Sequence, residues 1–169
     1  EQASIYLRQG NCYDAIRVYP SPTEAHYQLA IGRCHLKMGQ LSSAEAMLLE
    51  VDGALKKHAT RYRSAAALLA RETYKAQILA EELLQDPDLK EEAQLLKAKA
   101  AVANEQYIAA RDTLRPLLIG KRANDGYLPS ASEIDPAEIR WLLAEGARLR
   151  GSSNASISAY WKIWTANPT

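Results

Sequence analysis

The side chains best suited to chemistry in this sequence are three histidines and two cysteines. His26, His35 and His58 could form a helical zinc site only if two of them were four residues apart, and no pair has that spacing. The sequence has no glycine-rich phosphate loop and no serine in a nucleophile elbow. Because Cys12 lies beside an expected turn and Cys34 lies on an apolar helical face, we interpret both as small packing residues. We therefore predict no catalytic residue, no metal site and no cofactor.

The composition narrows the classes of function. The chain has 169 residues, of which 47% are hydrophobic and 24% charged, enough for one folded domain or a short repeat array. Its formal net charge is +1, and the interspersed acids and bases lack the basic excess of a nucleic-acid-binding protein. No apolar run reaches the roughly 18 residues that a membrane span needs. Two cysteines do not define a disulfide framework, so the sequence does not assign a compartment.

The hydrophobic pattern is helical. Apolar residues recur at intervals of three and four, and strand-like alternation is missing. Residues with high helix propensity dominate the segments 63–84 and 89–118. Asp135 followed by Pro136 is typical of a helix start, because proline is favoured at the first helical position. We predict an all-α protein with about nine or ten helices.

Two glycines interrupt one of these helical patterns. Gly39 follows the first helix of an expected hairpin, where glycine can adopt the left-handed conformation that closes the turn. Gly32 lies one heptad earlier, and its missing side chain would let that helix pack closely on the next one, near Ala44 and Leu48. This spacing, which includes His35, resembles that of a tetratricopeptide repeat (TPR), a helix-turn-helix unit of about 34 residues.

The same spacing recurs along the chain. The turn positions are 10, 39, 71, 105 and 151, so the intervals are 29, 32, 34 and 46. Gly, Pro, Asn and Ser in the segment 119–133 explain the longest interval as a loop insertion at about 119–135. We predict one domain, 1–169, that is a TPR-like α-solenoid of antiparallel helix pairs in a right-handed superhelix, with a plain helical bundle as the alternative. The repeat-packing residues are Gly32, Gly39, Ala44, Ala110, Gly151 and Tyr160.

The repeat pattern also predicts a binding surface. The first helices of such pairs line a concave groove, and several of the residues that map to it are basic. Long cationic side chains could clamp an acidic peptide or a terminal carboxylate, whereas the alternative is a solvated helical face. The predicted groove residues are His26, Arg33, Lys37, Arg61, Lys99, Trp141, Glu145 and Arg148.

Three segments, 25–30, 61–66 and 159–169, resemble the superhelical N-terminal region of bacterial soluble lytic murein transglycosylases. The resemblance implies a periplasmic protein that cleaves peptidoglycan through a separate catalytic domain, while this region positions the substrate. No catalytic residue carries over, because neither Glu105 nor Glu145 is followed by the residues of the family's catalytic motif.

Two functions of different class follow. The first is a non-catalytic helical-repeat module that binds a protein or peptide partner in its groove. The second is the substrate-positioning region of a cell-wall enzyme, which would associate with peptidoglycan. In either case we expect the sequence to be a segment of a larger protein.

Overall fold

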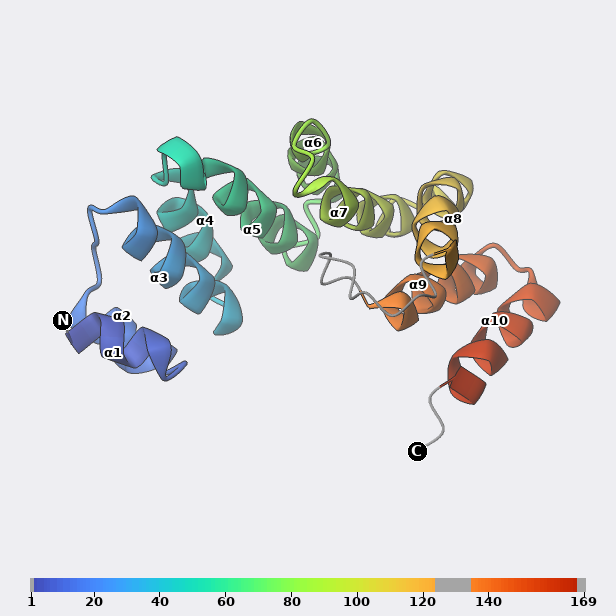
Figure 1. Ribbon diagram of the computed structural model, residues 1–169, viewed down its shortest axis with the longest axis horizontal. Coiled ribbons are helices and arrows are strands. Elements are labelled where there is room, and N and C mark those ends of the chain that lie inside the picture. Colours follow the sequence, from blue (N-terminus) through green and yellow to red (C-terminus); the bar gives the residue numbers. More distant parts are fainter. Residues whose placement is uncertain (1, 124–134, 167–169) are drawn as a thin grey trace. The chain divides into compact units, whose positions relative to one another are not determined.

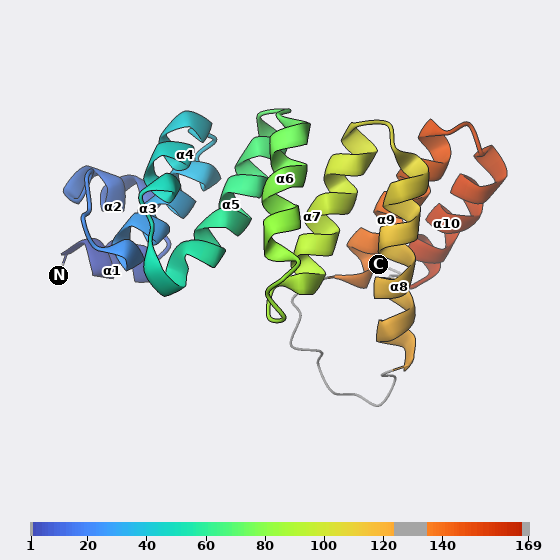
Figure 2. The ribbon, with the colours of Figure 1, turned by 90° about the horizontal axis from the view of Figure 1, so that it is seen from above.

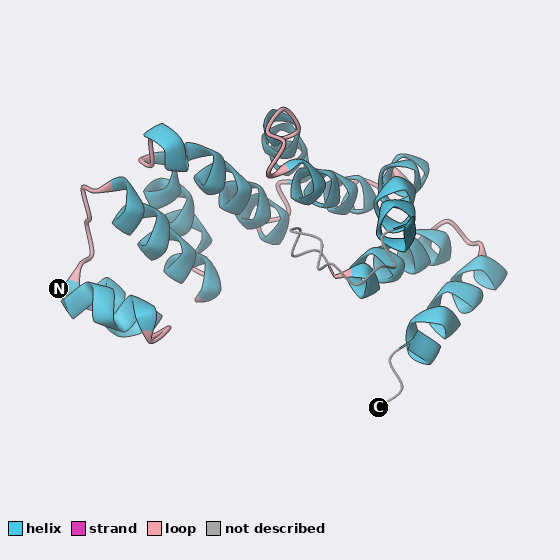
Figure 3. Ribbon diagram, in the orientation of Figure 1, coloured by secondary structure: helices cyan, strands magenta, loops and turns pink. Residues whose placement is uncertain are grey.

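The computed structural model describes residues 2–123 and 135–166, and in these residues it contains ten α-helices, one short 3-10 helix and no strand (Figure 1). Figure 3 shows that the described backbone outside these helices is short connecting loops. The all-α fold class and the expected number of helices are confirmed. The helices are α1 (Gln2–Arg8), α2 (Cys12–Val18), α3 (Ala25–Lys37), α4 (Leu41–Leu49), η1 (Gly53–Leu55), α5 (Lys56–Leu69), α6 (Thr73–Leu83), α7 (Lys90–Ala103), α8 (Tyr107–Ala123), α9 (Pro136–Leu149) and α10 (Ser153–Ala166).

The chain forms two compact units, Glu1–Leu79 (unit 1) and Ala80–Thr169 (unit 2), and the division falls within α6. In unit 1, α1 packs on α2 and α3 packs on α4. The buried Ser64 of α5 also donates a hydrogen bond to the Ala76 carbonyl at the start of α6 (2.8 Å). In unit 2, α7 packs on α8 and α9 packs on α10, which are visible as neighbours in Figure 2. Each unit is therefore a stack of helix pairs.

Five helix pairs close through the same kind of turn. After α3, the Gly39 N–H donates to the Leu36 carbonyl (3.0 Å) and the Gln40 N–H donates to the His35 carbonyl (2.9 Å). This pair of bonds satisfies carbonyls that the helix end leaves free, and it requires a left-handed residue at the turn. The same two bonds and a positive φ, between 61° and 79°, occur at Gly10, Gly39, Arg71, Glu105 and Gly151.

Two of these turns carry a side chain where glycine fits better. Arg71 and Glu105 both have φ of 61°, a conformation that costs an L-residue roughly 1–2 kcal/mol. We therefore expect Glu105→Gly to raise the free energy of unfolding of unit 2 by about 0.5–1 kcal/mol. The backbone strain at this position is relieved, but the greater flexibility of glycine in the unfolded chain offsets part of that gain. Urea unfolding, monitored by circular dichroism, measures this change. The control Glu82→Gly, inside α6, should instead destabilise, and a loss of stability in both variants would contradict the assignment.

The insertion begins later than the sequence analysis predicted. We expected a loop from 119 to about 135, but α8 continues to Ala123 and includes Pro116. Leu114 and Leu117 are buried, and the residues that follow them are mostly good helix formers. Together they sustain the helix past Gly120, the residue that had indicated a loop. Residues 124–134 lie outside the described part of the chain. The helix after the insertion begins as expected, since the Asp135 carboxylate accepts a hydrogen bond from the Ala137 N–H (2.8 Å).

The two cysteines form a disulfide, so our interpretation of both as simple packing residues was wrong. Cys12, the first residue of α2, is bonded to Cys34 of α3, with a Cα–Cα distance of 5.0 Å. The bond connects two consecutive helix pairs. Sequence spacing could not reveal it. The two cysteines are 22 positions apart on different helices with a linker between them, and the packing of α2 against α3 brings the sulfurs together.

Candidate functional site

The basic residues predicted for unit 1 lie on the first helices of two neighbouring pairs. His26, Arg33 and Lys37 are separated by seven and four residues, which places them on one exposed face of α3. Arg61 lies on α5, and it shares an aromatic neighbour with Arg33. Both guanidinium groups lie over the ring of Tyr62, 5.0 Å (Arg33) and 4.5 Å (Arg61) from its centroid. We call these five residues the α3–α5 face.

Tyr62 holds this face in place. Its ring packs against the buried cluster of Leu48, Val51 and Ala59, and its hydroxyl accepts a hydrogen bond from Nη2 of Arg61 (2.5 Å). A guanidinium over an aromatic ring is attracted by the ring's electron-rich face, so two flexible arginines are restrained by one fixed side chain. Sequence analysis missed Tyr62, because its contact with Arg33 joins two different helices and no spacing rule predicts it.

Two of the cations on the α3–α5 face are not paired with an acid in the described part of the chain. Within the described residues, Arg33 and Lys37 have no ion pair with a carboxylate. A guanidinium restrained on a ring still presents N–H groups that can bind a carboxylate in a bidentate manner. The arrangement is therefore suited to binding an anionic group.

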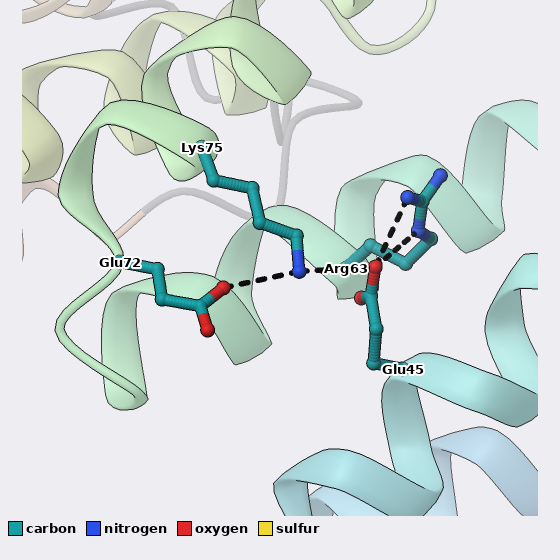
Figure 4. A network of polar contacts seen from close by, with 4 residues as sticks. All are labelled: Glu45, Arg63, Glu72 and Lys75. Atoms are coloured by element: carbon teal, nitrogen blue, oxygen red, sulfur yellow. Dashed lines mark hydrogen bonds and ion pairs between the residues drawn. The ribbon is translucent and has the colours of Figure 1, made fainter.

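Elsewhere in unit 1, opposite charges neutralise one another (Figure 4). Arg63 of α5 donates to Oε1 of Glu45 in α4 through Nε (3.1 Å) and Nη2 (3.0 Å). Nζ of Lys75 in α6 lies 3.2 Å from the same oxygen and 3.0 Å from Oε2 of Glu72. Burial alone would raise the pKa of Glu45, but hydrogen bonds from Arg63 and then Lys75 outweigh it and hold the pKa below its ordinary value. The network joins three helices, so a structural role suffices to explain it.

The predicted groove residues of unit 2 divide into an ion pair, an exposed aromatic residue and a polar cluster. Nζ of Lys99 in α7 lies 2.5 Å from Oε1 of Glu138 in α9, so this lysine is neutralised within the unit. Trp141 of α9 is half exposed. Of the eight predicted groove residues, four lie in unit 1 and four in unit 2.

The third group in unit 2 is a cluster around Glu145. Its carboxylate accepts hydrogen bonds from Nε of Arg148, one turn later on α9 (2.9 Å), and from the Tyr160 hydroxyl of α10 (2.7 Å). These hydrogen bonds lower the pKa of Glu145 from 4.5 to about 2, and the bond from Arg148 has the larger effect. Hydrogen bonding to the same carboxylate raises the pKa of Tyr160. The cluster ties α10 to α9 and leaves Glu145 with two donors already.

This cluster predicts an acid-sensitive contribution to stability. The pKa of Glu145 is lower in the folded state than its ordinary 4.5, so the contribution is present above about pH 4.5 and is lost as the pH falls toward 2. We expect Glu145→Gln to flatten the pH dependence of unfolding in that window, and Tyr160→Phe to reduce it partly. Urea unfolding at a series of pH values tests this prediction. If the free energy of unfolding of Glu145→Gln fell between pH 4.5 and 2 as steeply as that of the wild-type protein, the prediction would be wrong.

The described residues contain no group of three side chains that could hold a metal ion. Within the same part of the chain, no helix has both the length and the apolarity needed to cross a membrane.

Comparisons with known proteins identify the fold. No protein-family model matches the sequence, and the search of curated proteins found no significant match. Among solved structures, MamA (41-end) from Desulfovibrio magneticus RS-1 superposes with a TM-score of 0.74 at 15% identity, covering 96% of this chain and 89% of that chain. The nearly identical TPR-like repeats of a kinesin light chain from Podosopora anserina superpose with a TM-score of 0.69 at 15% identity, covering 99% and 94%.

The fold is TPR-like. This confirms the helical-repeat prediction made from the spacing of the turn residues. None of the comparisons supports the resemblance to lytic transglycosylases, and none supports a periplasmic location or binding to peptidoglycan. At 15% identity the structural likeness establishes the architecture, so the function must be argued from the residues of this chain.

Proposed function

We propose that this chain is a non-catalytic interaction module and that the α3–α5 face binds an acidic segment of a partner protein. The observation that carries the proposal is the pair of arginines over Tyr62, next to Lys37, on a face where Arg33 and Lys37 have no ion pair with an acid among the described residues. In stacked helical repeats the first helices of the pairs line the concave side, where extended segments bind. Both α3 and α5 are first helices of their pairs.

The proposed binding mode follows from the side chains. Arg33 presents a planar fork of donors that matches a carboxylate, and its stacking on Tyr62, beside Arg61, reduces the rotamer freedom lost on binding. Lys37 and His26 lie on the same face of α3 on either side of Arg33 and would extend the contact along the partner. Because most of these groups are solvent-exposed, the affinity should fall as ionic strength rises.

A charge-reversal titration tests the proposal. We expect a short fluorescein-labelled peptide of alternating glutamate and alanine to bind the wild-type protein, measured by fluorescence anisotropy at low salt, while its lysine-containing counterpart does not. The double variant Arg33→Glu/Arg61→Glu should bind the acidic peptide at least about tenfold more weakly, since each charge reversal replaces attraction by repulsion.

The matched control is Arg8→Glu/Lys56→Glu, which changes the net charge of unit 1 by the same amount at exposed positions outside the α3–α5 face. This variant should retain most of the affinity. Equal weakening in the two double variants would show that only net charge matters, and no binding to the wild-type protein would also contradict the proposal.

A further inference from the structure

Within the described residues, the N-terminal helix pair has no large hydrophobic side chain that is fully buried. Across α1 and α2 the fully buried hydrophobic residues are Ala3 and Ala15, both small, and Tyr6, Leu7 and Ile16 are partly buried. Larger apolar side chains of the same helices, Ile5, Tyr13 and Val18, are 51%, 65% and 39% exposed. Hydrophobic stabilisation scales with the apolar area removed from water, so a helix pair without a fully buried large side chain is stabilised less than the pairs that have one.

Besides the packing of α2 on α3, a disulfide and a tyrosine side chain attach this helix pair to the rest of unit 1. One is the Cys12–Cys34 disulfide between α2 and α3. The other is Tyr19, which follows α2, stacks edge-on against Tyr27 (5.4 Å between ring centroids) and donates a hydrogen bond from its hydroxyl to Glu24 (2.5 Å). The tyrosine contact lies on the linker side, close in sequence to α3. The disulfide is therefore the covalent attachment between the start of α2 and α3.

We propose that Cys12–Cys34 is a thiol–disulfide exchange site, and that its reduction by a dithiol reductant releases the α1–α2 pair from α3. A thiolate of the dithiol attacks Sγ of Cys12, forms a mixed disulfide and expels Cys34 as a thiolate, which takes up a proton. The second thiol of the dithiol, as its thiolate, then attacks its partner sulfur in the mixed disulfide and releases Cys12, which is protonated in turn. Two electrons pass from the dithiol to the disulfide, and the dithiol leaves as its own disulfide.

Burial indicates which sulfur is attacked. Cys34 is 5% exposed on the inner side of α3, whereas Cys12 is only partly buried at the start of α2. Access decides which sulfur of a disulfide an incoming thiolate reaches, so Cys12 receives the attack and Cys34 is the leaving group. Release of the pair then exposes the side of α3 that carries Cys34.

Hydrogen–deuterium exchange of the whole protein, with and without dithiothreitol pretreatment, tests this inference. In the reduced protein we expect the amides of α1 and α2 to exchange at least about tenfold faster, while the amides of α5 keep their protection. The variant Cys12→Ser/Cys34→Ser should match the reduced protein and should not respond to dithiothreitol. Unchanged protection of α1 and α2 after complete reduction would overturn the proposal, and so would an equal loss of protection in α5, since that result indicates unfolding of the whole unit.

Discussion

Replacing Gly32 with alanine should destabilise unit 1 by about 1–2 kcal/mol, although alanine is normally the better helix residue by about 1 kcal/mol. A Cβ at position 32 would lie 2.7 Å from both Cγ and Cδ2 of Leu48, closer than carbon atoms can approach. Leu48 is 1% exposed within the core of unit 1, so it has no free space to move into. The overpacking cost therefore exceeds the gain in helix propensity.

A double-mutant cycle isolates this contact. Leu48→Ala alone should cost about 3 kcal/mol because it leaves a cavity, whereas Gly32→Ala in the Leu48→Ala background should be close to neutral or stabilising. The matched control is Gly146→Ala in the middle of α9, where the added Cβ would meet only Cδ1 of Tyr107 at 4.0 Å. That variant should be stabilised by about 0.5–1 kcal/mol. If Gly32→Ala and Gly146→Ala changed the free energy of unfolding in the same direction, the close crossing of α3 and α4 at Gly32 would be contradicted.

The largest expected loss in unit 2 is at Leu114. Its side chain is fully buried in α8 and packs in one cluster with Leu95, Leu117, Ile139 and Leu142. Truncating a leucine at such a position removes transfer free energy and leaves a cavity, so Leu114→Ala should cost about 3 kcal/mol. The cluster draws on α7, α8 and α9, and its loss would weaken the packing of all three helices.

The tryptophans allow this change to be measured in unit 2 alone. The chain has three, at 141, 161 and 164, and unit 1 contains none. The midpoint of urea unfolding, monitored by tryptophan fluorescence, should therefore be clearly lower in Leu114→Ala than in the wild-type protein. Leu149→Ala, in the same unit but 43% exposed, should change the free energy of unfolding by no more than about 0.5 kcal/mol. Similar shifts in the two variants would argue against a core centred on Leu114.

The repeat architecture could be predicted because each helix pair repeats its local requirements. A left-handed residue must close each turn, and the five turn positions chosen from spacing alone all have positive φ, including Arg71 and Glu105, which carry side chains. The boundary of α8 was harder to predict. Gly120 is a local loop signal, whereas the helix is sustained by propensity and by burial of Leu114 and Leu117 against other helices.

Contacts between helix pairs could not be predicted. Glu45 and Arg63 are 18 residues apart on different helices, and no helical spacing rule connects them. The Cys12–Cys34 disulfide depends in the same way on stacking. On the α3–α5 face, spacing placed His26, Arg33 and Lys37 on one side of a helix, but the sharing of Tyr62 by two arginines required the packed structure.

The most direct test of the proposed function is nuclear magnetic resonance of the arginine side chains during titration with the acidic peptide. If the α3–α5 face binds carboxylates, the Nε–Hε resonances of Arg33 and Arg61 should shift progressively, while that of Arg148, already bonded to Glu145, should stay in place. Peptide binding that leaves Arg33 and Arg61 unshifted, or that shifts Arg148 instead, would contradict the account.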